Sequence, residues 1–386
     1  MLKNRKSVLI ITPAFRPNVG GAETYVNELC EHLRTHNHYV YVLTYQPITT
    51  PDVKGENLER LENMEVRRFW WMGCNLFHKT EKYPVLNFLY VTPYLFLRCF
   101  WWMLWNYKKI DVIDAQGFNS AFIGRILKKI FKKRTIASIM SLYDFVPESR
   151  LAKNVAWILK GVDHIIAESA VSKKEMMSIG VPAEKITPYV EWVDLEKFKP
   201  SDKEKLKEKL GFSKVFIVLF VARAIKIKGA DLLLGVAERM KGEAVTFLFI
   251  STGGPMVKVL KEAAENMENV IFIEGVDYKN LPDYYAAADV FVIPSRYSEN
   301  AARTVVEAIA CGTPVIGSNM GAIPSLMDIS VGILVEPEVE DIEKAVRRLF
   351  DNKDILKKLT DSCRPYALKK FSSDNAKAIL NSYNKS

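Results

Sequence analysis

The sequence predicts an α/β protein with two domains, each built around a doubly wound parallel sheet. Short apolar runs that are typical of buried strands alternate with segments of helical apolar spacing in both halves of the chain. The chain has 386 residues, of which 49% are hydrophobic, so it can bury two cores of ordinary size. A charged segment with few apolar residues, 198–214, separates the two halves.

The predicted strands are rich in Val and Ile, as expected for strands that are buried on both faces of a parallel sheet. In the N-terminal half they are 8–12, 40–44, 66–70, 112–114, 136–139 and 165–167. In the C-terminal half they are 215–221, 246–250, 270–273, 290–293 and 315–316. We expect an N-terminal domain over 1–197, a C-terminal domain over 198–365, and a final helix within 366–386 that packs back onto the N-terminal domain.

Composition excludes several classes of protein. The cysteines are odd in number, widely spaced and without a Cys-x-x-Cys pair, which argues against a disulfide framework or a zinc site and favours a reducing cytoplasm. No cysteine or carboxylate cluster accompanies the histidines, so we expect no metal. The apolar run from Val8 is too short for a secretory signal and is interpreted as the first strand.

The positive charge of the chain is unevenly distributed. Of the net charge of +9, all arises in residues 1–190, which hold 26 basic and 17 acidic residues, because the rest of the chain holds 28 of each. A uniformly basic nucleic-acid-binding protein does not need this asymmetry, and no nucleic-acid partner is expected. The excess charge is instead expected to serve whatever the N-terminal half contacts.

Two carboxylates, Glu299 and Glu307, lie at the two ends of one short structural unit. A buried strand, 289–293, ends at Pro294, a polar turn follows, and the apolar spacing over 304–310 predicts a helix. Glu299 is therefore expected in a loop at the carboxyl end of a strand, where ligands of open α/β sheets bind. Glu307 is expected within the first two turns of the helix.

A sugar nucleotide is a ligand that suits this unit. A carboxylate accepts hydrogen bonds from two vicinal hydroxyls, and the N–H groups at a helix start meet hydroxyl or phosphate oxygens. These N–H groups belong to Ala301, Ala302, Arg303 and Thr304.

The segment resembles the Glu-x7-Glu motif of the retaining group 1 glycosyltransferases of family 4, and the following ACGTPVIGS, 310–318, strengthens the likeness. The resemblance implies the GT-B fold, in which two Rossmann-like domains face each other across a cleft. It also implies that Glu307 holds the nucleotide ribose and that Glu299 holds hydroxyls of the donor sugar. The nucleotide-diphosphate sugar is then the donor substrate, and no separate cofactor is expected.

Two other loops carry residues that suit a phosphate. Gly20 and Gly21 precede a predicted helix and match the family's Gly-Gly-Ala-Glu loop, which covers the donor phosphate, although an ordinary strand-to-helix turn is the alternative. Arg223 and Lys228 follow a predicted strand, and two cations there suit a diphosphate leaving group, whereas a solvated basic turn is the alternative. The resemblance assigns Arg223 and Lys228 to the pyrophosphate.

The resemblance extends to two further turns of the C-terminal half. It implies that main-chain groups near Val276 contact the nucleotide base, which leaves the identity of the base open. The turn at Gly254 and Pro255 is interpreted as architectural.

Several positions depart from the family pattern. Asp114 and Gln116 stand where the family has His-x-His, Glu191 stands where an Asn is usual, and Ala302 fills a position that is commonly Gly or Pro. We entertain the hypothesis that Asp114 or Gln116 hydrogen-bonds the donor sugar or the acceptor hydroxyl. Sugar, base, acceptor and oligomeric state are not determined by the sequence.

The aromatic segment 84–107 carries one charge, Arg98, and is long enough to span a bilayer. A single crossing would separate strands of one sheet, so a buried helix with a bend at Pro93 is one alternative. The tryptophans of this region and the basic helix 125–134 favour the other, contact with an anionic inner membrane leaflet. These tryptophans are Trp70, Trp71, Trp101, Trp102 and Trp105.

Together these features predict a retaining, metal-independent glycosyltransferase of the hexosyltransferase type. It is expected to move a sugar from a nucleotide-diphosphate donor to a glycan or lipid-linked acceptor in the assembly of cell-surface polysaccharide, glycolipid or glycoprotein. We expect it in the cytoplasm, peripheral to the membrane. The alternatives are another sugar-nucleotide-dependent reaction, such as epimerisation, and a catalytically silent donor-binding or scaffold protein.

Overall fold

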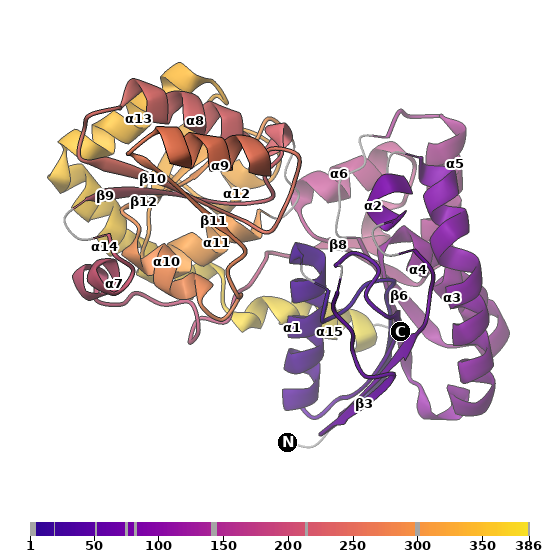
Figure 1. Cartoon of the computed structure of the whole chain (residues 1–386). Coiled ribbons are helices and arrows are strands. Elements are labelled where there is room, and N and C mark those ends of the chain that lie inside the picture. Colours follow the sequence, from indigo (N-terminus) through magenta and orange to yellow (C-terminus); the bar gives the residue numbers. More distant parts are fainter. Residues whose placement is uncertain are drawn as a thin grey trace. The chain divides into compact units, whose positions relative to one another are not determined.

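The computed structural model describes residues 5–18, 20–50, 52–73, 76–80, 83–139, 145–212, 215–297 and 302–384. The chain divides into two compact units, each with one sheet covered by helices (Figure 1). Unit 1 comprises Met1–Tyr189 and Ala376–Ser386, and unit 2 comprises Val190–Asn375.

Unit 1 is built on an eight-stranded sheet in the order β3-β4-β2-β1-β5-β6-β7-β8. Its strand pairs are parallel except for the edge pair of β3 and β4. Residues 8–11 of β1 are fully buried, as expected for a central strand that is apolar on both faces. The strands are β1 (Ser7–Ile11), β2 (Tyr39–Tyr45), β3 (Leu58–Leu61), β4 (Met64–Phe69), β5 (Val112–Gln116), β6 (Arg134–Ile139), β7 (His164–Ala167) and β8 (Ile186–Pro188).

Helices cover both faces of this sheet, with α3, α4 and α5 on one face and α1 and α15 on the other (Figure 1). One buried cluster joins α3 and α4 to the sheet and includes Leu9, Leu95 and Leu127. A second cluster lies under α4 and α5 and includes Leu159 and Ile165. The helices are α1 (Gly21–Thr35), α2 (Leu76–Thr80), α3 (Pro84–Asn106), α4 (Gly117–Phe131), α5 (Arg150–Lys160), α6 (Ala170–Ser178) and α15 (Lys377–Asn384).

Unit 2 is built on a six-stranded parallel sheet in the order β11-β10-β9-β12-β13-β14. Alternate residues of β12 enter opposite cores: Phe291 lies in the cluster that contains α11 and α14, and Val292 lies in the cluster that contains α8 and α13. The strands are β9 (Phe216–Val221), β10 (Val245–Ser251), β11 (Val270–Glu274), β12 (Val290–Ile293), β13 (Val315–Ser318) and β14 (Gly332–Val335). The helices are α7 (Lys203–Lys209), α8 (Ala230–Arg239), α9 (Val257–Asn266), α10 (Leu281–Ala287), α11 (Arg303–Ala310), α12 (Ile323–Leu326), α13 (Val339–Asp351) and α14 (Lys353–Lys370).

Each predicted strand corresponds to a strand of the structure, and the prediction of two parallel-sheet α/β domains is confirmed. The sequence analysis did not predict β3, β8 and β14. β3 is a short edge strand with two charged residues and little burial, and β8 spans three residues and ends at a proline, so neither shows an apolar run.

The units divide the chain at Val190 and Ala376, whereas we had expected divisions at 198 and 366. The junction segment belongs to unit 2 because Val193 N–H donates to the Phe371 carbonyl at 3.2 Å and Phe198 lies fully buried in the unit 2 core. The chain joins unit 1 again where Tyr383 of α15 contacts β5.

Candidate functional site

The topological switch point of unit 2 lies between β9 and β12. The chain adds β10 and β11 on one side of β9 and then returns to place β12, β13 and β14 on the other side. β9 and β12 are parallel neighbours, so the segments that follow them leave the same edge of the sheet. Ligands of open α/β sheets bind at this place. Arg223 and Lys228 follow β9, and α11 with Glu307 follows β12.

The two segments at the switch point are joined directly. The Arg296 N–H donates to the Ile227 carbonyl at 2.9 Å, and Arg296 Nη1 donates to the Lys226 carbonyl at 2.9 Å. Gly229 has a left-handed φ of 78°, and a Cβ at this position would collide with the Pro294 carbonyl. Only glycine permits this approach, so the chain beside Lys228 is fixed against the end of β12.

The turn that carries Arg223 is held by the β10–α9 connection. Ala224 N–H donates to the Gly253 carbonyl and to Ser251 Oγ, each at 2.9 Å. Gly254 has a φ of 132°, and a Cβ there would meet the Ala224 carbonyl. These contacts fit the architectural role predicted for Gly254. The Arg223 side chain itself is exposed.

Helix α11 begins at Arg303, after Ala302 in a left-handed conformation with φ 41° and ψ 52°. The N–H groups of Arg303 and Thr304 therefore lie in the first turn, where the helix provides no acceptor. A left-handed φ costs a non-glycine residue roughly 1–2 kcal/mol, so the alanine at this position is strained. Glu299 and Ala301 lie outside the described residues.

Glu307 is buried, with 2% of its surface exposed, and its two oxygens have described donors. Tyr285 Oη donates to Oε2 at 2.9 Å, and Arg303 Nε donates to Oε1 at 3.2 Å. Burial and then the Glu307 charge raise the pKa of Tyr285 well above its ordinary value, so the phenol remains a donor. A carboxylate has about four acceptor positions, so its oxygens can accept ribose hydroxyls as well as hydrogen bonds from protein donors.

Arg303 also reaches a second carboxylate. Its Nη1 donates to Glu191 Oε1 at 2.5 Å, and its Nη2 donates to Tyr278 Oη at 3.1 Å. Sequence reasoning considered only the backbone N–H of Arg303 and gave no role to Tyr278 or Tyr285. The spacing of four between Arg303 and Glu307 was the available signal, since such pairs meet on one helix face.

The remaining predicted positions lie on separate elements. Val276 is half-buried in the connection after β11, behind Gly275 with a φ of 75°. Gly20 and Gly21 stand at the start of α1 in unit 1. No described heavy atom beyond its chain neighbours lies within 4 Å of where a Cβ of Gly21 would stand, so packing within unit 1 does not require glycine there.

Asp114 has a structural role that differs from the hypothesis made for it. It is fully buried, and its carboxylate accepts from Tyr383 Oη at 2.6 Å, Gln116 Nε2 at 2.9 Å and Ser138 Oγ at 3.0 Å. Burial raises the pKa of Asp114 to about 6, although the Tyr383 and Ser138 hydrogen bonds oppose the shift. Asp114 thus anchors α15 to β5. Gln116 Oε1 is also buried and has no partner in the described part of the chain.

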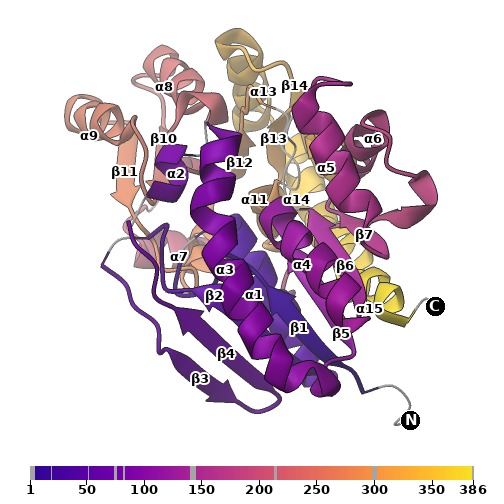
Figure 2. The same ribbon diagram turned by 90° about the vertical axis from the view of Figure 1, so that its right-hand side faces the viewer.

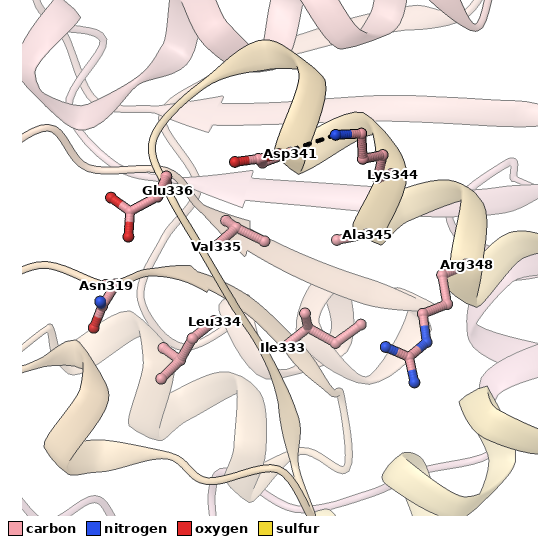
Figure 3. A pocket seen from close by; sticks show the side chains of 9 residues that line it. All are labelled: Asn319, Ile333, Leu334, Val335, Glu336, Asp341, Lys344, Ala345 and Arg348. Atoms are coloured by element: carbon pink, nitrogen blue, oxygen red, sulfur yellow. Dashed lines mark hydrogen bonds and ion pairs between the residues drawn. The ribbon is translucent and has the colours of Figure 1, made fainter.

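A hollow of about 480 Å³ opens beside β14 and α13, away from the switch point (Figure 3). The Asp341 and Lys344 side chains on its α13 wall pair at 3.3 Å. None of the described residues that the sequence analysis predicted to bind the donor lines this hollow. Among the described residues, no group of three or more His, Cys, Asp and Glu side chains is arranged to hold a metal ion.

The two halves of the chain match two protein-family models. Residues 19–197 match the model described as Glycosyltransferase Family 4, and residues 202–370 match the model described as Glycosyl transferases group 1. The chain belongs to the group 1 glycosyltransferases of family 4. The resemblance inferred from the Glu-x7-Glu segment is therefore confirmed.

Relatives of this glycosyltransferase support the same assignment. An uncharacterized glycosyltransferase of Methanocaldococcus jannaschii is 24% identical, over 99% of this chain and 98% of its own length. An uncharacterized 41.2 kDa protein in the cps region of Klebsiella pneumoniae is 31% identical, over 72% of this chain and 78% of its own. The solved structure of Anabaena HepE in complex with UDP-glucose is 18% identical and has a TM-score of 0.77, over 99% and 100% of the two chains. This likeness confirms the GT-B fold.

Proposed function

We propose that this glycosyltransferase is a retaining, metal-independent enzyme that moves a hexose-type sugar from a nucleotide-diphosphate donor to a glycan or lipid-linked acceptor. The observation that carries the proposal is the placement of Glu307. A buried carboxylate with fixed donors lies on α11 beside the switch point, and cations follow the neighbouring strand. HepE, which has this fold, binds UDP-glucose, and this supports a nucleotide sugar as the donor.

The proposed roles follow from charge. Glu307 accepts the ribose hydroxyls, and Glu299 accepts hydroxyls of the donor sugar. Arg223 and Lys228 face the diphosphate, whose negative charge grows as the bond from the anomeric carbon to the phosphate oxygen breaks. The acceptor oxygen forms its new bond on the same face of the sugar, and its proton passes to the departing phosphate. Such a reaction needs neither a bound metal nor a protein base, so the absence of the family's histidines is compatible with transfer.

We place the enzyme in the assembly of cell-surface polysaccharide, glycolipid or glycoprotein glycans, in the cytoplasm and peripheral to the membrane. The acceptor is then an oligosaccharide or a sugar on a lipid carrier.

A donor screen tests the proposal. The full chain is incubated with UDP-, GDP- and ADP-sugars, and both thermal stabilisation and release of nucleoside diphosphate are measured. A ligand at a hundredfold its dissociation constant stabilises the fold by roughly 2.7 kcal/mol. We expect the nucleotides of one base to stabilise the protein, and the nucleotide sugar of that base to release its nucleoside diphosphate slowly. Arg223→Met should slow this release more than it weakens nucleotide binding. Stabilisation without any release would favour the silent donor-binding alternative, and no stabilisation by any nucleotide would refute both.

A further inference from the structure

Helix α3 presents an apolar face to the outside of unit 1. Apart from Arg98, its residues 84–106 carry no charge, and the Arg98 guanidinium is turned onto the Phe69 ring at 4.5 Å. Figure 2 shows α3 in front of the other elements of unit 1, and no described element of that unit covers it. The side chains that we call the α3 face are 50–82% exposed: Val85, Leu86, Leu89, Leu97, Trp101 and Trp105.

The α3 face is not used for packing α3 on the sheet of unit 1. The opposite side of α3 already supplies Val91, Leu95 and Met103 to the core of unit 1. A helix on the surface of a soluble domain normally turns polar residues outward, and large exposed apolar patches mark interaction sites. The tryptophans of this region differ in their surroundings. Trp71 stacks on Tyr94 at 4.7 Å and Trp102 contacts Tyr41 at 5.1 Å, whereas Trp101 and Trp105 point away from the core.

Cations gather at the C-terminal end of the α3 face. Helices α3 and α4 run in the same direction, because Phe88 contacts Phe122 near their beginnings and Tyr107 contacts Phe131 near their ends. Their ends therefore bring together what we call the lysine cluster: Lys108, Lys109, Lys129, Lys132 and Lys133. None of these five forms an ion pair within the described ranges.

The cluster borders a hollow of about 480 Å³ at the end of α4. Lys129, Lys132 and Lys133 line it together with Lys128 and Arg134. Its one acidic side chain, Asp163, is already paired with Lys128 at 2.7 Å. The hollow is therefore cationic and suits a phosphate group.

We infer that the α3 face and the lysine cluster form a docking surface for an anionic lipid bilayer, with α3 lying along the membrane. Tryptophan side chains favour the boundary between water and lipid, and lysines beside it meet anionic headgroups. Within the described residues, no helix combines the length and apolar character needed to cross a bilayer, and a helix lying flat needs neither. The surface gives a use for the excess positive charge of the N-terminal half. The inference rests on the proposed function in one respect: the use of the docking surface would be to bring the enzyme to an acceptor presented at the membrane.

Vesicle flotation of the full chain tests the docking surface. We expect the protein to float with vesicles that contain phosphatidylglycerol and to bind vesicles of phosphatidylcholine alone much less well. Each lysine near an anionic surface raises partitioning roughly fivefold. The triple variant K108Q/K109Q/K132Q is therefore expected to bind the anionic vesicles roughly a hundredfold more weakly, and its binding should depend less on salt than that of the wild type. W101S/W105S is expected to lose binding at both low and high salt.

Matched variants in unit 2 control for charge and surface polarity. K353Q/K358Q/K369Q makes the same change in net charge on exposed side chains of α14, and I329S/L368S removes two exposed apolar residues. Both are expected to float as the wild type does. An unchanged midpoint of urea denaturation, followed by the fluorescence of the tryptophans that remain in unit 1, would show that the α3 variants are folded.

Three outcomes would overturn the inference. The wild type could remain in the bottom fraction with anionic vesicles, or the unit 2 controls could lose binding to the same extent as the α3 variants. The chain could also be a dimer in solution that W101S/W105S converts to a monomer without any flotation of the wild type, which would make the α3 face a contact between copies. Flotation without nucleotide binding would refute the proposed function and leave the docking surface intact.

Discussion

Arg303 Nη1 donates to Glu191 Oε1 at 2.5 Å, although Glu191 lies 112 residues earlier in the chain. The Glu191 side chain is buried, and only 10% of the Arg303 side-chain surface is exposed. Through Nε, the same guanidinium contacts Glu307 on the next turn of α11. One cation therefore contacts two buried carboxylates, and one of these carboxylates lies at the first residues of unit 2. Arg303 fixes the orientation of the Glu307 side chain and ties α11 to the junction segment at the same time.

Replacing Arg303 is expected to destabilise unit 2. Arg303→Met leaves both carboxylates buried without this guanidinium, and removing one partner of a buried ion pair costs about 3–5 kcal/mol. Amide hydrogen exchange of peptides from α11 and from 190–198 would measure the loss. Glu191→Gln is the matched control, because its amide oxygen still accepts from Arg303, and a smaller cost is expected. Equal costs for the two variants, with simple additivity in the double variant, would show that Arg303 does not couple the two segments.

The sequence predicted which elements carry the candidate site residues better than it predicted the contacts between their side chains. The run at 290–293 is apolar on both faces, so it predicted a buried strand, and the following proline and helical spacing placed Glu307 on a helix. The Arg303–Glu191 contact could not be predicted, because it joins residues far apart in the sequence and because Glu191 departs from the family pattern. The burial of Asp114 could not be predicted from the sequence either. It depends on Tyr383, which returns from the far end of the chain.

Glu307→Gln is expected to weaken nucleotide binding while leaving unit 2 folded. The glutamine keeps one oxygen for a donor but loses the charge, and a hydrogen bond to a charged group contributes roughly 1.5–3 kcal/mol, or about 10- to 150-fold in affinity. Titration calorimetry with the nucleoside diphosphate selected by the donor screen would measure the change. Tyr285→Phe removes only one donor to the same carboxylate and should reduce affinity less. Unchanged affinity in Glu307→Gln would remove the ribose from the assignment of this residue.

Ala302→Gly is expected to stabilise unit 2 slightly. The left-handed conformation costs alanine roughly 1–2 kcal/mol, whereas glycine adopts it freely. Loss of the buried methyl group offsets about 0.8 kcal/mol, so a net gain of at most about 1 kcal/mol is expected in the free energy of unfolding. Urea denaturation would measure it. Ala308→Gly is a suitable control, since Ala308 lies inside α11 and glycine there should destabilise the helix by about 1 kcal/mol or more. A destabilised Ala302→Gly protein would mean that the side-chain contacts of Ala302 outweigh its backbone strain.

The stability of unit 1 is expected to depend on pH through Asp114. Burial raises the pKa of this carboxyl from its ordinary value of 3.8 to about 6, so the folded state binds the proton more tightly than the unfolded chain does. The resulting stabilisation, roughly 3 kcal/mol, is fully present below about pH 4 and is lost as the pH rises through about 6.

Urea denaturation followed by tryptophan fluorescence would test this, because every tryptophan except Trp192 lies in unit 1. In Asp114→Asn the titrating group is absent, so the unfolding free energy of the wild type minus that of the variant should fall by roughly 3 kcal/mol between about pH 4 and pH 7. Ser138→Ala keeps the carboxyl and removes one hydrogen bond that opposes the pKa shift, so the stability of this variant should fall with pH at least as steeply as that of the wild type. If the Asp114→Asn and wild-type curves run parallel over this range, Asp114 titrates normally, and the anchoring of α15 to β5 does not depend on its protonation.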